Sequence, residues 1–367
     1  MKTNFKKRRS NLKQKVKSLG VSAILITNIK NVGYLTGFTG SAGYLFVTPK
    51  SEILLSDSRY TSQLQAQCPD LTVDIRDASS TMLDSVSRIA KASKFSSIAF
   101  ESNSITKSLF DQIESAVENV DLVSTSSVVE DLRAIKDKTE IALIRKSIHV
   151  NQRSFEAIRA QLTPDQTELQ IAHNLEHQMR AFGATGCAFD PIVGVGARSA
   201  LPHGYPTNAK IRDGDFLLID WGAEVDGYLS DLTRILVTSK IPPKLRKIYN
   251  VVLKAQLAAI KKIRPGVALK TVDSAARKTI EKAGFGDKFG HGLGHSFGLE
   301  IHEQPFMSPI HQGTLEAGMV ITVEPGIYLP EFGGVRIEDD ILVTPDGCEV
   351  LSNLPKQIEE CTVDLGG

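Results

Sequence analysis

The chain lacks the features that mark several specialised classes of protein. Its four cysteines are scattered with no CxxC spacing, so the sequence indicates neither a thiolate zinc site nor a dense disulfide framework. We therefore expect four reduced cysteines with a structural role. Neither sign of charge is in excess, because 43 basic residues stand against 42 acidic ones, so the composition gives no support for binding nucleic acid or a membrane surface.

Long apolar runs are also missing. The longest are short segments such as VSAILIT and FLLI, far below the roughly 18 residues that a transmembrane helix needs. The basic N-terminus, MKTNFKKRRSNLKQKVKSLG, continues into lysines and polar residues where a signal peptide would have an apolar stretch. We interpret this segment as a helix with a solvated basic face, and we expect a cytoplasmic protein.

The length predicts two domains, because 367 residues exceed the size at which a single hydrophobic core usually keeps growing. In the first third, helical stretches alternate with short β-rich runs, which is typical of an α/β domain. These runs cover residues 21–27, 43–48, 53–56 and 97–100. The segment 124–140 changes from Ser/Thr-rich to charged, and we place the boundary there, with domains at 1–128 and 129–367.

The second domain begins with predicted helices and continues with predicted strands. Ile141, Ile144 and Ile148 share one face of a helix, and Thr167 with Gln170 has the spacing of a capping box. Later runs such as PIVGVG, FLLIDWGAEVDGYLSDLTRILV and VITVEPGIYL are β-like and separated by glycines. Helices that cover a mainly antiparallel sheet make an α+β arrangement.

One predicted hairpin brings two carboxylates together. Asp226-Gly227 is a strong signal for a two-residue turn, and its register places Asp220 and Asp231 on one face as diagonal neighbours. The adjoining runs FLLI and ILV indicate that the hairpin is at least partly buried. Buried carboxylates need a cation, and either a metal ion or Arg234 would serve. Two acids pointing to solvent from a surface hairpin would be the structural alternative.

Three histidines gather in FGHGLGHSFGLEIHEQP. His291, His295 and His302 are interleaved with glycines, which allow the backbone to approach a ligand closely. The segment differs from the HExxH pattern of single-zinc proteases, because Gly292 follows His291. A cluster of this kind points to chemistry rather than packing alone.

Two glutamates complete a set of ligands for metal ions. Glu324 lies in an otherwise apolar run, and Glu338 shares a strand face with Arg336, where an internal ion pair is the alternative. Four carboxylates with a bridging hydroxide would nearly balance the charge of a pair of divalent cations. The oxygen-rich shell with one imidazole favours manganese, with cobalt, zinc or iron as competitors. The candidate set is Asp220, Asp231, Glu324, Glu338 and one histidine.

At these residues the chain resembles the pita-bread metallopeptidases, the family of aminopeptidase P, prolidase, creatinase and methionine aminopeptidase. The motifs DWGAEVDGYLSDLTR, HGLGHSFGLEIHE, VEPGIY and RIEDD occur in the family's order, preceded by PHGYPTNAKI. NIKNVGYLTGFTGSAG and LLSDSRY resemble the creatinase-type N-terminal domain. The resemblance implies a C-terminal pita-bread fold, an antiparallel sheet covered by helices, behind an N-terminal α/β domain.

The resemblance also implies roles for the five candidate ligands. Asp220 would bind one metal ion, and His295 with Glu324 would bind the other. Asp231 and Glu338 would bridge the two ions, and a hydroxide between the ions would attack the peptide. Glu324 would also accept the proton of the attacking water.

Other residues match family positions around the substrate. His203, His291 and His302 would line the substrate site and assist proton transfer. Arg336 and Tyr328 would orient the ligands from behind.

The expected activity is therefore that of an Xaa-Pro aminopeptidase acting on a peptide with proline at its second position. The N-terminal domain argues against methionine aminopeptidase, and the complete ligand set argues against creatinase and against an inactive peptide-binding module. Prolidase, an Xaa-Pro dipeptidase, remains the alternative. Relatives of this kind are often homodimers, so the resemblance makes a homodimer the candidate assembly, but the sequence itself shows no interface.

Overall fold

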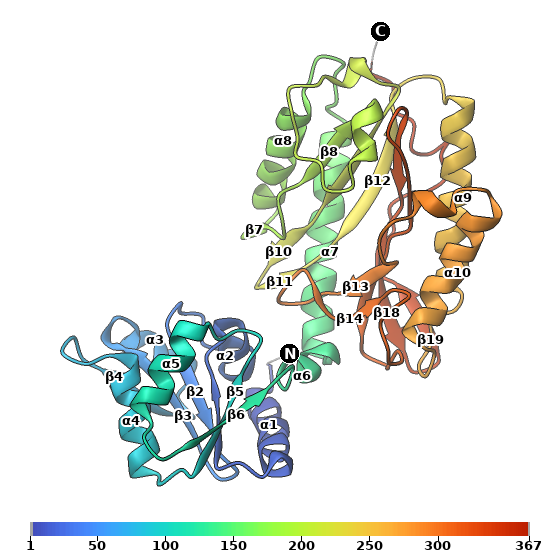
Figure 1. Cartoon of the computed structure of the whole chain (residues 1–367). Coiled ribbons are helices and arrows are strands. Elements are labelled where there is room, and N and C mark those ends of the chain that lie inside the picture. The colour runs from blue at the N-terminus through green and yellow to red at the C-terminus, as the bar shows by residue number, and fades with distance from the viewer. Residues whose placement is uncertain (1–2, 366–367) are drawn as a thin grey trace. The chain divides into compact units, whose positions relative to one another are not determined.

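A computed structural model describes residues 3–365 of the chain. It divides into two compact units, Met1–Arg133 and Ala134–Gly367, a few residues beyond the boundary expected from composition (Figure 1). Within residues 3–365, none of the helices has the length and apolar character that a bilayer-spanning helix needs. The four cysteines are free thiols, as predicted.

The first unit is an α/β domain built on one six-stranded sheet with the order β4-β3-β2-β1-β5-β6. β1 and β2 are antiparallel, as are β2 and β3, whereas the outer pairings are parallel. The strands are β1 (Ala23–Ile26), β2 (Tyr44–Val47), β3 (Glu52–Asp57), β4 (Thr72–Arg76), β5 (Ser97–Glu101) and β6 (Asp121–Thr125). The helices are α1 (Phe5–Leu19), α2 (Ile29–Thr36), α3 (Thr61–Gln67), α4 (Met82–Ala92), α5 (Lys107–Ala116) and α6 (Glu130–Ala134).

The basic N-terminal segment forms the predicted helix, but its basic residues are not all solvated. Arg8 and Arg9 are only 6% and 2% exposed. The guanidinium of Arg9 donates to the carbonyl of Leu35 at 3.0 Å and pairs with Asp70. The interpretation as a purely solvated face is therefore wrong for these two arginines. α1 packs both against α2, where Arg8 donates to the carbonyl of Tyr34 and Arg9 to that of Leu35.

The second unit has the predicted α+β arrangement, in which every ladder between named strands is antiparallel. Its helices are α7 (Lys138–Arg159), α8 (Glu168–Ala181), α9 (Pro243–Ile260) and α10 (Leu269–Lys282). Its first strands are β7 (Gly186–Cys187), β8 (Ile192–Val195), β9 (Phe216–Trp221), β10 (Ala223–Val225), β11 (Tyr228–Leu229) and β12 (Leu232–Val237). The later strands are β13 (Gly294–Ser296), β14 (Glu303–Met307), β15 (Val320–Val323), β16 (Gly326–Leu329), β17 (Gly333–Arg336), β18 (Asp339–Thr344) and β19 (Gly347–Val350).

Helices flank the sheets of this unit on two sides. Figure 1 shows α7 and α8 along one side and α9 and α10 along the other. The capping box of Thr167 and Gln170 starts α8 as predicted, and a second one of Asp137 and Glu140 starts α7. Ile144, buried on α7, joins the packing against the sheet.

The hairpin β9 to β12 separates two hydrophobic cores. Alternate residues of a strand point to opposite faces, so Leu217 and Ile219 enter the core beneath α7 and α8, whereas Phe216 and Leu218 enter the core beneath α9 and α10. Both faces are therefore buried, which explains the continuous apolar run FLLI. By the same alternation, Asp220 points to the α9 and α10 side.

The turn of the hairpin has the predicted geometry. Asp226 and Gly227 have φ of 52° and 80°, and both lie in the left-handed region that this two-residue turn requires. Val225 pairs with Tyr228, and the same register continues into β12.

Candidate metal centre

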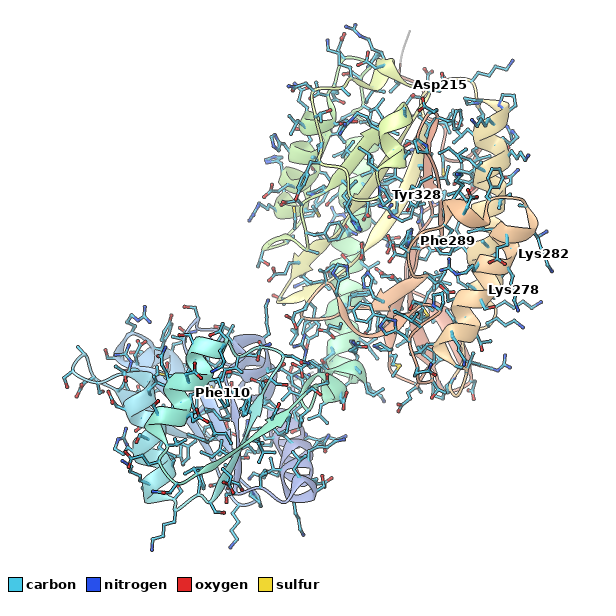
Figure 2. The ribbon with its side chains drawn as sticks, viewed as in Figure 1. Phe110, Asp215, Lys278, Lys282, Phe289 and Tyr328 are labelled. Atoms are coloured by element: carbon cyan, nitrogen blue, oxygen red, sulfur yellow. The ribbon has the colours of Figure 1, made fainter. Side chains whose placement is uncertain are left out.

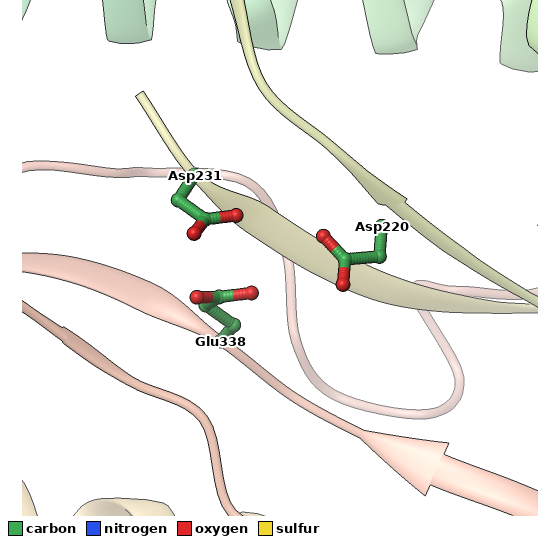
Figure 3. A group of neighbouring side chains, drawn as sticks. All are labelled: Asp220, Asp231 and Glu338. Atoms are coloured by element: carbon green, nitrogen blue, oxygen red, sulfur yellow. The ribbon is translucent and has the colours of Figure 1, made fainter. Parts of the chain in front are cut away.

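Three carboxylates converge in the interior of the second unit. Asp220 is in β9, Asp231 immediately precedes β12, and Glu338 lies between β17 and β18. All three are buried, and one oxygen from each lies within 4.8 Å of the others (Figure 3). Asp220 faces Thr233 across the ladder, so Asp220 and Asp231 are the diagonal neighbours that the hairpin register predicts.

His295 and Glu324 extend this group. The Nε2 atom of His295, on β13, lies 3.6 Å from Oδ2 of Asp231 and 3.4 Å from Oε1 of Glu324. The Nδ1–H group of His295 donates a hydrogen bond to the carbonyl oxygen of Ser296 at 3.1 Å, which leaves the lone pair on Nε2. Burial lowers the pKa of His295 to about 4, so the imidazole is neutral near pH 7 and suited to bind a metal ion.

The charges of this group are not balanced by the described side chains around it. The group contains four buried or nearly buried carboxylates. The only positive charge beside them in the described part of the chain is the guanidinium of Arg336, which forms an ion pair with Asp220. Among the described residues, Oδ1 of Asp220 and Oε1 of Glu338 are buried without a hydrogen-bond partner. Unpaired buried carboxylates are costly, so the donor set fits divalent cations.

The pKa values of the acids reflect the same excess of buried negative charge. Burial raises the pKa of Glu324 to about 8. Burial, and then repulsion from Glu338, raises the pKa of Asp231 well above its usual range. Burial and repulsion from Glu324 do the same for Glu338.

Two threonines, neither of which the sequence motifs point to, orient the glutamates. Thr233 donates to Oε2 of Glu338 at 2.6 Å, and Thr322 donates to Oε1 of Glu324 at 3.2 Å. Thr233 lies two residues after Asp231, and Thr322 lies two residues before Glu324. A period of two along a strand puts these hydroxyls on the same face as the acids, a pattern that could have revealed them.

Arg234 and Arg336 do not form the ion pairs that were the alternatives to a metal site. Arg234 does not neutralise the hairpin acids; it pairs with Asp339 at 2.8 Å and donates to the backbone carbonyls of Thr233 and Glu338. Arg336 pairs with Asp220 rather than Glu338, because its guanidinium reaches across to β9.

The carboxylates lie in the wall of a cleft of about 520 Å³ that His203, His291 and His302 also line. His302 packs edge-on against His295, with ring centroids 4.5 Å apart. Tyr328, labelled in Figure 2, contacts His291 Nε2 at 3.0 Å and accepts from Arg336 at 2.9 Å. Burial lowers the pKa of His291 to about 4 and also lowers that of His302. The cleft is also lined by residues that were not among the predicted site residues: Tyr205, Phe306, Ser308 and His311.

Comparison with models of known protein families shows which family the chain belongs to. The profile of metallopeptidase family M24 matches residues 142–345, which is more than half of the chain. The chain belongs to metallopeptidase family M24. The creatinase/prolidase N-terminal domain matches residues 8–135. Both matches confirm the family and the fold class that the motifs predict.

Several known proteins are similar to the chain over nearly their whole length. A solved Xaa-Pro dipeptidase from Bacillus anthracis is 37% identical with a TM-score of 0.94, covering 97% of this chain and 99% of that one. A solved X-Pro aminopeptidase from Thermotoga maritima is also 37% identical, with a TM-score of 0.87 and coverage of 94% and 99%. An Xaa-Pro dipeptidase from Pyrococcus horikoshii is 35% identical over 339 residues, which is 92% of this chain and 94% of the relative.

Proposed function

We propose that this M24 metallopeptidase hydrolyses the peptide bond between an N-terminal residue and proline in Xaa-Pro dipeptides. Asp220, Asp231, His295, Glu324 and Glu338 would hold two divalent ions, with manganese as the favoured metal. The observation that carries the proposal is the group of buried carboxylates in the cleft wall, two of which keep an oxygen without a hydrogen-bond partner.

The dipeptidase replaces the aminopeptidase that the sequence motifs favour. Two of the three relatives described above are Xaa-Pro dipeptidases, and one of these has the higher TM-score among the two solved structures. The aminopeptidase is the second candidate, because the Thermotoga maritima enzyme has the same sequence identity to this chain. The two candidates differ in whether a residue may follow proline, and not in the bond that is cleaved.

The side chains have distinct tasks in this reaction. Bound divalent ions lower the pKa of water and polarise a peptide carbonyl. Glu324 is in the cleft wall, where its carboxylate takes up the proton of the attacking water. Arg336 forms an ion pair with Asp220 and donates a hydrogen bond to the hydroxyl of Tyr328, so it holds both side chains in place.

The histidines serve the leaving group. The nitrogen of proline must gain a proton as the bond breaks. His302 lies against His295 and lines the same cleft, which supports the proposal that it supplies this proton. His291 is held between Tyr328 and the carbonyl of Gly292, which fixes its ring as part of the wall.

Proline suits recognition in a cleft of this kind. Its ring fixes φ, and its nitrogen in a peptide has no hydrogen to satisfy. A site shaped for the ring gains less from a flexible residue, so specificity should appear in kcat/KM.

A peptide panel tests the proposal. Manganese-loaded protein should cleave Leu-Pro, leave Leu-Ala largely intact, and act more slowly on Leu-Pro-Gly; the chelated protein should cleave none. Equal rates on Leu-Pro and Leu-Ala would remove the proline specificity. Faster cleavage of Leu-Pro-Gly than Leu-Pro would move the assignment to the aminopeptidase. Full activity after complete removal of metal would overturn the metal centre.

A further inference from the structure

A buried ion pair lies behind the histidines of the cleft. Nζ of Lys136 is 3.1 Å from Oε2 of Glu303, and their side chains are only 1% and 6% exposed. The described residues that line the cleft include neither of them. A buried ion pair adds little to stability, because desolvation offsets the attraction between the charges. The contacts of the pair point to another role.

The pair closes the loop that joins β13 to β14. Oε1 of Glu303 accepts hydrogen bonds from the backbone N–H groups of Leu299 and Glu300, at 2.9 and 3.1 Å. Nζ of Lys136 also donates to Oγ of Ser296 at 2.8 Å. Ser296 and Glu303 are partners across the two strands, so Lys136 joins both ends of the loop.

Each end of the loop adjoins a histidine of the site. Ser296 follows His295, and its carbonyl oxygen holds the Nδ1 proton of that ring. Glu303 follows His302, whose ring lies 4.5 Å from the ring of His295. The strand register shifts between His295 and Ser296, so the regular ladder does not by itself fix the spacing of the two rings.

Gly298 leaves space for the ion pair. A Cβ at this position would lie 3.1 and 3.2 Å from the two carboxylate oxygens of Glu303 and 3.2 Å from Cε of Lys136. These separations are tighter than ordinary contacts, and the neighbours are held by several hydrogen bonds. This glycine of the HGLGHSFGLEIHE motif therefore serves the ion pair.

We infer that Lys136 and Glu303 are positioning residues, which hold the imidazole of His302 in place relative to His295 for the peptidase reaction. Neither residue contacts the substrate; both act through the loop. The inference rests on the proposed function to the extent that His302 acts on the leaving group.

Kinetics of matched variants test this role. Lys136→Met and Glu303→Gln should each lower kcat on Leu-Pro by about 10- to 100-fold, with little change in KM and with metal content retained at saturating manganese. The double variant should be no slower than the slower single variant, because the two residues act as one unit. Lys136→Arg should recover part of kcat. Lys146→Met is the control, because it removes a lysine from the exposed pair with Asp226 in the same unit.

Several outcomes would overturn the inference. Wild-type kcat in folded Lys136→Met and Glu303→Gln would do so, as would a loss of kcat that only follows a loss of bound metal. If the fold-loss of kcat in the double variant equalled the product of the two single losses, the residues would act separately.

A spectroscopic measurement keeps this test independent of the substrate. In zinc-loaded protein, the imidazole ¹H–¹⁵N signals of His295 and His302 should shift in Lys136→Met and Glu303→Gln and stay in place in Lys146→Met. Unmoved signals in the folded variants would overturn the positioning role. A wild-type enzyme that cleaves no Xaa-Pro peptide would instead overturn the proposed function, and the imidazole signals would still decide the role of the ion pair.

Discussion

Removing the metal ions should make the stability of the second unit fall as pH rises. In the metal-free protein, burial raises the pKa of Glu324 from 4.5 to about 8. A carboxyl with a raised pKa in the folded state favours folding when protonated. Its contribution is present in full below its ordinary pKa of 4.5, and it is lost as pH rises through about 8.

The size of this effect follows from the shift in pKa. Between pH 4.5 and pH 7, Glu324 ionises in the unfolded chain but stays largely protonated in the fold, which lowers the free energy of unfolding by about 3 kcal/mol. Asp231 and Glu338 act in the same direction, because their pKa values are also raised. Divalent ions bind the ionised carboxylates and reverse the penalty. At a thousand times Kd, binding adds about 4 kcal/mol, or about 8 to 16 °C in Tm for a unit of this size.

The single tryptophan provides the assay. Trp221 is fully buried in β9, next to Asp220, and stacks on Phe155 with ring centroids 4.4 Å apart. Its fluorescence therefore reports the unfolding of the second unit. Thermal unfolding of chelated and manganese-loaded protein should be recorded at pH 5.5 and 7.5. We expect the gain in Tm on adding manganese to be larger at pH 7.5.

A control variant isolates the contribution of one carboxyl. Glu324→Gln cannot ionise, so the chelated variant should lose less stability between pH 5.5 and 7.5 than the chelated wild type. An equal manganese gain at both pH values would refute the reasoning, and so would a chelated protein that becomes more stable as pH rises.

Three further predictions concern single residues. Asp231→Asn should lower bound manganese, measured by elemental analysis, more than Arg336→Lys does; equal losses would contradict a bridging role. His295→Ala should lose metal affinity, whereas His302→Ala should keep the metal and lose turnover, and equal metal loss in both would remove the distinction. Arg9→Met should lower the stability of the first unit by about 2 kcal/mol in chemical denaturation, because it removes the ion pair with the partly exposed Asp70 and the hydrogen bond to the carbonyl of Leu35; an unchanged midpoint would show that Arg9 is dispensable.

The sequence predicts the elements of the first unit best where they are buried on both faces. β1 is buried at all four positions and was expected from its apolar run. β4 and β6 were missed because they are the two edge strands of the sheet, with exposed and half-buried residues and little apolar periodicity. An edge strand is specified by its neighbour as much as by its own residues, so local sequence reveals it poorly.

The same distinction applies to the metal centre. Asp220 and Asp231 follow from strand alternation and one turn, which are local rules. The approach of His295 and Glu338 to this hairpin depends on strand pairings distant in sequence. Residue types suggested Glu338 and one histidine as candidate ligands, but the choice of His295 and the role of each ligand came only from the resemblance to a known family. The ion pairs of Arg234 and Arg336 were predictable only in part. The sequence indicates that both arginines need an acidic partner, but the tertiary fold decides that the partners are Asp339 and Asp220.

The length of the turn at Asp226 and Gly227 constrains how this enzyme can vary. Inserting or deleting one residue there would shift the pairing of the following strand by one position and send Asp231 to the opposite face. That face lies beneath α7 and α8, where Leu232 and Leu236 now pack in an apolar core. Substitutions in the turn are therefore tolerable as long as the backbone keeps its shape, whereas a change of one residue in length would remove a carboxylate from the centre and place it among aliphatic side chains.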